Sequence, residues 1–222
     1  MPDRWICFDV NGTLLDPGTL ARAWGEDAGR AHPLIFAALQ EAVFAAGVDA
    51  MTGELRPLPE LLGATLARRA RLAGLDPACA EQAVALAREM DAYPDAAPAL
   101  DALADAGFRL AAVTNSTAEA VTAALGHAGL LDRLAEVVGI DEVGRPKPHP
   151  DVYAHALRRL GAEAEETWFV AGHWWDVTGA KRAGLRTAWV AREERELLSC
   201  APPPDVSASD LRVAAADIQA AG

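Results

Sequence analysis

The sequence predicts an α/β fold, in which a parallel β-sheet is covered by helices and carries an inserted helical subdomain. A short apolar strand near the N-terminus is followed by a long stretch with helical apolar spacing. The second half of the chain alternates between strand and helix patterns, which is typical of a parallel sheet with helices on both faces. A length of 222 residues fits one such domain with an insertion.

The first predicted strand is Arg4–Val10, which is short, apolar and followed by the turn dipeptide Asn11-Gly12. Asp9 interrupts the apolar run, so the segment does not match the apolar region of a signal peptide. We therefore expect a buried strand here, with a carboxylate at its end.

The stretch from about residue 17 to residue 95 has helical apolar spacing and no evident strand. Leu34–Val48 is apolar on more than one face, which predicts a well-buried helix. Leu58–Leu72 and Ala80–Met90 continue the helical pattern, and turn signals such as Thr52-Gly53 separate the pieces. We assign residues 17–94 to a helical cap, and residues 1–16 and 95–222 to the core domain.

The alternating half of the chain begins after Tyr93-Pro94, and Pro202–Asp210 within it is expected to be an exposed loop. Ligands bind at the carboxyl ends of the strands in such sheets, so we expect the inserted helices to cover that edge. The predicted elements are, in order, helix Ala97–Ala106, strand Phe108–Thr114, helix Ala118–Ala128, strand Val137–Ile140, helix Asp151–Leu160, strand Thr167–Ala171, helix Val177–Ala183, strand Thr187–Val190 and helix Leu211–Ala220.

The composition excludes several classes of partner. A net charge of −12 repels phosphate backbones, so we expect no nucleic-acid partner, and an anionic substrate requires a local pocket of hydrogen-bond donors. No uninterrupted apolar run reaches 18 residues, so no membrane-spanning helix is expected. The three cysteines have no metal-ligand spacing, and we expect reduced thiols in a cytoplasmic protein.

Polar clusters follow several of the predicted strands, at the edge where ligands bind. Because the carboxyl ends of parallel strands meet at one edge of a sheet, we expect these clusters to come together. An aspartate that directly follows a strand on a glycine turn can act as a nucleophile and form an ester intermediate. The four clusters are Phe8–Asp16 (FDVNGTLLD), Val113–Ser116 (VTNS), Arg145–Pro150 (RPKPHP, followed by Tyr153) and Ala171–Asp176 (AGHWWD).

The order and spacing of these clusters resemble the haloacid dehalogenase superfamily over nearly the whole chain. Each motif is weak alone, and the four in order carry the resemblance. The resemblance implies a Rossmann-like parallel core with an inserted helical cap, and a hydrolase in which Asp9 is the nucleophile. Lys147, between two prolines, keeps Asp9 ionised and offsets developing negative charge. Asp176 pairs with Lys147, orients the hydrolytic water or holds a metal.

Further residues are expected to bind the substrate or support the site. Thr13 is placed to orient Asp9, and Thr114 and Asn115 supply a hydroxyl, an amide and backbone N–H groups. A simpler structural role, such as capping a turn or filling the core, remains open for each of them. The supporting set is Asn11, Thr13, Thr114, Asn115, Tyr153, His173 and Trp175.

The phosphatases of this superfamily resemble the motif Asp-x-Asp-Gly-Thr, and Asn11 stands at the position of its second aspartate. That second aspartate protonates the leaving alkoxide, which contributes roughly 10²–10⁴-fold. Asparagine cannot do this, whereas a halide leaves without a proton. The fourth cluster also lacks one metal-binding acid, so no cofactor and no metal site are expected. Under the phosphatase alternative, Asp9 and Asp176 hold Mg²⁺.

The sequence also departs from the 2-haloacid dehalogenases, which have a tyrosine at the Asn11 position and an arginine in the first long cap helix. Leu34–Val48 contains neither arginine nor lysine. The favoured function is metal-free hydrolytic dehalogenation of small 2-haloacids. A Mg²⁺-dependent phosphatase with an altered acid position and a non-catalytic binding protein are the alternatives. The resemblance is also compatible with a homodimer.

Overall fold

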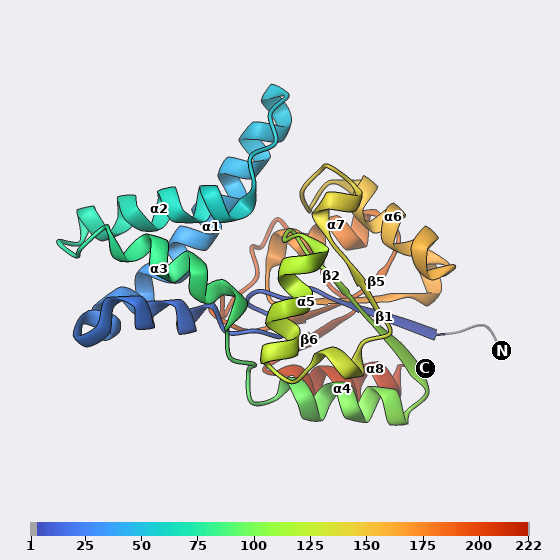
Figure 1. Cartoon of the computed structure of the whole chain (residues 1–222). Helices are drawn as coiled ribbons and strands as arrows, with labels where there is room; N and C mark the ends of the chain where they lie inside the picture. Colours follow the sequence, from blue (N-terminus) through green and yellow to red (C-terminus); the bar gives the residue numbers. More distant parts are fainter. Residues whose placement is uncertain (1–3, 222) are drawn as a thin grey trace. The chain divides into compact units, whose positions relative to one another are not determined.

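The computed structural model describes residues 4–221, and its contacts divide them into two compact units (Figure 1). One unit runs through Leu15 and resumes at Ala92, and the other is Asp16–Asp91. The first contains the sheet and its helices, while the second is helical. This is the α/β architecture with a helical insertion that the alternating pattern predicts.

A single sheet of six parallel strands has the order β3-β2-β1-β4-β5-β6. The central strand β1 lies between β2 and β4, so the direction in which strands are added reverses there, and ligands bind at such reversal points in open α/β sheets. The residue that follows β1 therefore sits at the expected ligand site. The strands are β1 Arg4–Phe8, β2 Phe108–Val113, β3 Glu136–Val138, β4 Trp168–Ala171, β5 Arg186–Val190 and β6 Val206–Ala208.

Helices cover the sheet on both faces, since α4 packs against α8 on one side and α6 against α7 on the other (Figure 1). The helices of this unit are α4 Ala96–Asp105, α5 Ala118–His127, α6 Pro150–Leu160, α7 Trp174–Arg182 and α8 Leu211–Ala220. Short 3-10 turns occur at η3 Leu131–Arg133, η4 Ile140–Glu142 and η5 Ala164–Glu166.

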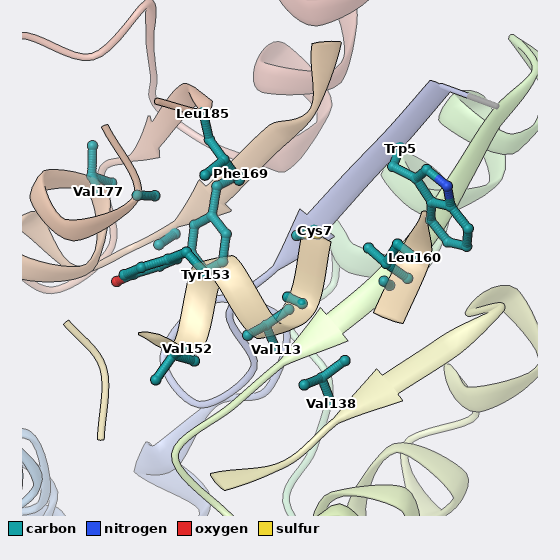
Figure 2. Close-up of a cluster of buried hydrophobic side chains, with 14 of the residues drawn as sticks. Trp5, Cys7, Val113, Val138, Val152, Tyr153, Leu160, Phe169, Val177 and Leu185 are labelled. Atoms are coloured by element: carbon teal, nitrogen blue, oxygen red, sulfur yellow. The ribbon is translucent and has the colours of Figure 1, made fainter. Parts of the chain in front are cut away.

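The core between the sheet and α6 is apolar and closely packed (Figure 2). Tyr153 on α6 meets the ring of Phe169 on β4 edge-on, with the ring centroids 5.3 Å apart. Val113 and Cys7 from the neighbouring strands are buried in the same cluster. Burial raises the pKa of the Cys7 thiol to about 12, so Cys7 is an inert core residue.

Two predicted elements of this unit are wrong in detail. Pro202–Asp210 was expected to be an exposed loop, but it contains β6, which pairs with β5 and buries Val206 and Ala208. A three-residue edge strand is too short to give a periodic signal in the sequence. Helix α7 begins at Trp174 rather than at Val177, which places Asp176 in its first turn.

The second unit consists of η1 Pro17–Asp27, α1 Ala28–Thr52, α2 Leu58–Leu72, α3 Cys79–Ala85 and η2 Leu86–Arg88. Helix α1 packs against α2 and η1, and it is longer at both ends than the predicted Leu34–Val48. The expectation of a well-buried helix is wrong for its C-terminal half, where Phe44 is 71% exposed and Met51 is 79% exposed.

One helical stretch, Pro17–Thr52, is long and apolar enough to cross a membrane by length and composition alone, with a mean hydropathy of 1.5 over its best window. The sequence pattern predicted none, because charged residues interrupt every apolar run. One such stretch is weak evidence, since core helices of soluble proteins meet the same criterion.

Candidate active site

Asp9 directly follows β1 at the carboxyl edge of the sheet. Its backbone N–H donates to the Val170 carbonyl at 3.0 Å, which fixes the residue against β4. The chain then turns at Gly12, whose φ of +84° lies in the left-handed region that favours glycine. A Cβ atom at this position would lie 2.7 Å from Nε2 of His173. The positive φ and the close approach of His173 therefore both require glycine here.

The ammonium group of Lys147 joins two carboxylates inside the protein. Its Nζ lies 2.8 Å from Oδ1 of Asp9, 2.6 Å from Oδ2 of Asp176 and 2.8 Å from the Val113 carbonyl. These contacts account for the three protons of an ammonium. Lys147 is 1% exposed, so its charge acts on the carboxylates with little solvent screening.

The charges set the ionisation of the three groups. Burial lowers the pKa of Lys147, but the carboxylates of Asp176 and Asp9 raise it above its ordinary value. Burial raises the pKa of Asp9, but the charges of Lys147 and His173 and the bonds from Lys147 and Thr13 bring it below its ordinary value. Burial raises the pKa of Asp176, and Lys147 offsets only part of that increase. Asp9 is therefore the more readily ionised carboxyl, as a nucleophile must be.

Thr13 orients the second oxygen of Asp9. Its hydroxyl donates to Oδ2 at 2.7 Å and accepts the backbone N–H of Gly172 at 2.8 Å. The fully buried side chain therefore ties the turn after β1 to the turn after β4. This contact supports the predicted orienting role, although Thr13 was also open to a simple turn-capping role.

Tyr153 binds Asp176 rather than Asp9. Its hydroxyl lies 2.5 Å from Oδ1 and 3.1 Å from the main-chain oxygen of Asp176. Burial raises the pKa of Tyr153 well above its ordinary value, so the phenol keeps its proton and donates. Gly179 on α7 makes this approach possible, since a Cβ atom there would lie 2.5 Å from the hydroxyl.

Asn115 holds the backbone of Lys147. Its Oδ1 accepts the Lys147 N–H at 2.7 Å, and its Nδ2 donates to the Lys147 carbonyl at 3.3 Å. The amide is thus engaged at both ends and supports the lysine. The Thr114 hydroxyl accepts the Ser116 N–H at 3.1 Å, and Asn11 donates from Nδ2 to the Ser116 hydroxyl at 3.4 Å.

His173 lies at the turn between β4 and α7, next to the turn after β1. Its Nε2 is 3.1 Å from the Asn11 carbonyl, and its Nδ1 is 3.3 Å from Oε1 of Glu194. Trp175 stacks on the imidazole, with the ring centroids 5.3 Å apart and an interplanar angle of 10°. The structure therefore places His173 next to the Asp9 turn, with Trp175 stacked on the imidazole.

Sequence reasoning missed three charged residues of this region. Arg192 donates from Nη2 to the Thr13 carbonyl and to Asp95 Oδ1, both at 2.9 Å. Asp95 in turn accepts the Leu211 N–H at 2.7 Å. Glu194 contacts His173. Arg192 and Glu194 lie in the segment after β5, and position after a strand was the only signal that pointed to them.

Each oxygen of the two buried carboxylates already accepts a hydrogen bond from a protein donor. Oδ1 and Oδ2 of Asp9 accept from Lys147 and Thr13, and the two oxygens of Asp176 accept from Lys147 and Tyr153. A Mg²⁺ ion needs several oxygens that face it. Within residues 4–221, no group of three or more His, Cys, Asp or Glu side chains is arranged to hold a metal ion.

Comparison with known proteins decides the family. A model described as haloacid dehalogenase-like hydrolase matches residues 4–184. The chain belongs to the haloacid dehalogenase-like hydrolases. It is therefore an enzyme of the hydrolase class, and the resemblance carried by the four clusters is confirmed.

Haloacid dehalogenases are among the relatives of this hydrolase. The (S)-2-haloacid dehalogenase of Xanthobacter autotrophicus is 32% identical over 87% of this chain and 77% of that protein. The (S)-2-haloacid dehalogenase 1 of a Pseudomonas species is 38% identical, but the match spans only 47% of this chain and 46% of that protein, about half of each. A glyceraldehyde 3-phosphate phosphatase of Methanopyrus kandleri is 32% identical over 84% of this chain and 83% of that protein.

The solved structure of the L-2-haloacid dehalogenase from Xanthobacter autotrophicus has a TM-score of 0.87 to this hydrolase, at 24% identity. The likeness covers 99% of this chain and all of that one. At this identity it establishes the fold, and it confirms the predicted Rossmann-like core with a helical cap subdomain.

Proposed function

We propose that the protein is a hydrolytic dehalogenase of small 2-haloacids that acts without a metal and uses Asp9 as its nucleophile. One combination carries this proposal: Asp9 is ionised and oriented, and Asn11 stands where the phosphatases carry an acid. A carbon–halogen bond needs a nucleophile but no general acid. The named relatives include 2-haloacid dehalogenases, which supports the same substrate class.

In the first step, a carboxylate oxygen of Asp9 attacks the carbon that bears the halogen. The carbon–halogen bond breaks, the halide leaves with the electron pair, and an ester of Asp9 forms. Lys147 keeps Asp9 ionised before this step, and Thr13 holds the carboxylate in one orientation. We assign the substrate carboxylate to the polar groups at the end of β2, around Thr114 and Ser116.

In the second step, water attacks the carbonyl carbon of the ester. The ammonium of Lys147 offsets the charge on the resulting oxyanion, the bond between that carbon and the alkoxy oxygen breaks, and a 2-hydroxyacid leaves. Asp176, the other carboxylate at Lys147, accepts one proton of the water and passes it to the leaving alkoxy oxygen, and the proton left on the Asp9 carboxyl goes to solvent. The observed pairing with Lys147 is one of the three roles that the sequence left open for Asp176.

A single turnover in ¹⁸O-labelled water tests this route. With enzyme in excess over 2-chloropropionate, we expect unlabelled oxygen in the new hydroxyl group and one ¹⁸O atom in the Asp9 carboxyl, found by mass spectrometry of the tryptic peptides. Label in the hydroxyl during the first turnover would show direct attack by water and would remove Asp9 from the proposed role.

A magnesium-dependent phosphatase is the second candidate, favoured by the similarity to the glyceraldehyde 3-phosphate phosphatase. Asn11 at the acid position counts against this candidate, and so do the hydrogen bonds that the oxygens of Asp9 and Asp176 already accept from protein donors. p-Nitrophenyl phosphate is the test substrate, because its leaving group needs little protonation. Turnover of this substrate that requires added Mg²⁺ would favour the phosphatase candidate.

Replacing Tyr153 with phenylalanine is expected to move the acidic limb of kcat, which includes hydrolysis of the ester, to higher pH. The hydrogen bond from Tyr153 lowers the pKa of Asp176, so its loss raises that pKa and protonates Asp176 at a higher pH. The acidic limb is measured with 2-chloropropionate over the range in which the protein stays folded. An unchanged limb would mean that Asp176 does not need to be ionised for turnover.

We also propose a homodimer and a cytoplasmic location. Phe44, Val48 and Met51 lie on one side of α1 and are exposed, and an exposed apolar patch often marks an interface. We expect sedimentation to show a dimer that Phe44→Glu weakens, while Leu72→Glu, at an exposed leucine on α2, leaves it intact. A monomer in both the native protein and the Leu72 variant would contradict the dimer.

A further inference from the structure

His173 faces an oxygen acceptor at each ring nitrogen. Nε2 lies 3.1 Å from the main-chain carbonyl of Asn11, and Nδ1 lies 3.3 Å from a carboxylate oxygen of Glu194. A carbonyl and an ionised carboxylate have no proton to donate, and a neutral imidazole carries only one N–H. The doubly protonated imidazolium is therefore the form that satisfies both contacts.

Glu194 is held in place from a second side. Its other carboxylate oxygen accepts the backbone N–H of Trp174 at 2.8 Å, at the first residue of α7. The Glu194 side chain is 9% exposed and that of His173 is 11% exposed, so the pair lies largely away from water. The helix that positions Asp176 thus also positions the carboxylate partner of His173.

The charged groups around the imidazole favour its cationic form. The titratable groups that act on it are the carboxylates of Glu194, in the segment after β5, and of Asp9, at the end of β1. The nearby cations are bound to carboxylates of their own, Lys147 to Asp9 and Asp176, and Arg192 to Asp95. Burial lowers the pKa of His173, but Glu194 and Asp9 raise it above its ordinary value.

We propose that Glu194 keeps His173 doubly protonated, so that a second cation stands beside Asp9 in addition to Lys147. Both ring nitrogens are engaged by protein oxygens, so His173 acts through its charge and through its hold on the Asn11 turn. His173 and Glu194 are positioning residues rather than catalytic residues. The kinetic consequence rests on the proposed function, because a 2-haloacid is an anion that must approach an anionic nucleophile.

The protonation state of His173 can be measured without any activity. Long-range ¹H–¹⁵N correlation spectra of protein labelled at its five histidines report whether one or both ring nitrogens carry a proton, and His173→Asn assigns the signal. We expect the midpoint of His173 to lie above the ordinary histidine value of about 6.5, with both nitrogens protonated below it, and a lower midpoint in Glu194→Gln. Glu193→Gln, at an exposed neighbouring glutamate, is the control and leaves the midpoint unchanged.

A midpoint of His173 at or below the ordinary histidine value, or an equal midpoint in the native protein and Glu194→Gln, would overturn the proposal. The kinetic arm follows from the same titration. kcat/KM should fall on the alkaline side as His173 loses its proton, with the midpoint that the spectra give. Glu194→Gln should move this limb to lower pH and leave the rate at acidic pH nearly unchanged.

An equal loss of kcat/KM at every pH in Glu194→Gln would indicate a merely structural role and would contradict the proposal. If the native protein releases no halide from any 2-haloacid, the proposed function fails, whereas the spectra still decide the state of His173. The two failures are therefore distinguishable.

Discussion

Asp9→Asn is expected to abolish halide release while the protein remains folded. The amide cannot attack carbon as a carboxylate does, and loss of a nucleophile that acts as part of a unit costs roughly 10⁴-fold or more. The fold should persist because asparagine has nearly the same shape and keeps one oxygen that can accept from Lys147 or Thr13. The measurement is the rate of halide release under saturating 2-chloropropionate, together with the thermal unfolding curve.

Asp16→Asn is the matched control for this change. Asp16 lies in the same FDVNGTLLD segment, where its carboxylate accepts the Gly18 N–H at the start of η1, outside the described site. The control should therefore retain halide release. Activity in Asp9→Asn within tenfold of the native protein would exclude Asp9 as the nucleophile.

Lys147→Met is expected to lower both activity and stability. The change leaves the carboxylates of Asp9 and Asp176 buried without their shared cation, and breaking a buried ion pair in this way costs about 3–5 kcal/mol of unfolding free energy. The barrier to turnover should rise by about 3–4 kcal/mol, because the ammonium acts on developing charge at a site with little water.

A double variant separates these two effects. Adding Asp176→Asn to Lys147→Met removes one of the two unpaired charges and should restore part of the unfolding free energy but none of the activity, as the coupling of neighbouring groups predicts. Urea unfolding and halide release are measured on the same preparations. A stable double variant that has lost less than tenfold in rate would show that Lys147 does not take part in turnover.

Much of the site was predictable from the sequence because its parts lie in short motifs at strand ends. Asp9, Lys147 and Asp176 follow different strands far apart in the chain, yet parallel strands bring their carboxyl ends to one edge. The structure indeed joins all three through one ammonium group. The roles were less predictable than the positions, since Asn115 contacts the Lys147 backbone and Tyr153 contacts Asp176.

The residues that the sequence did not reveal are those whose partners depend on tertiary packing alone. Glu194 and Arg192 lie beyond the last motif, and nothing in their local pattern distinguishes them from solvated surface charges. They are informative only once Glu194 is seen against His173 and Arg192 against the Thr13 carbonyl. The short strand β6 was missed for a similar reason, because its pairing with β5 determines it more than its three residues do.

Halide release from short 2-haloacids, including fluoroacetate, in the presence of excess EDTA tests the central claim most directly. Asp9→Asn is assayed in parallel, and p-nitrophenyl phosphate with Mg²⁺ serves as the competing substrate. We predict that release by the native protein is unaffected by EDTA and absent in Asp9→Asn. Release that stops on chelation and returns with Mg²⁺, or phosphate release without any halide release, would contradict a metal-free dehalogenase with Asp9 as its nucleophile.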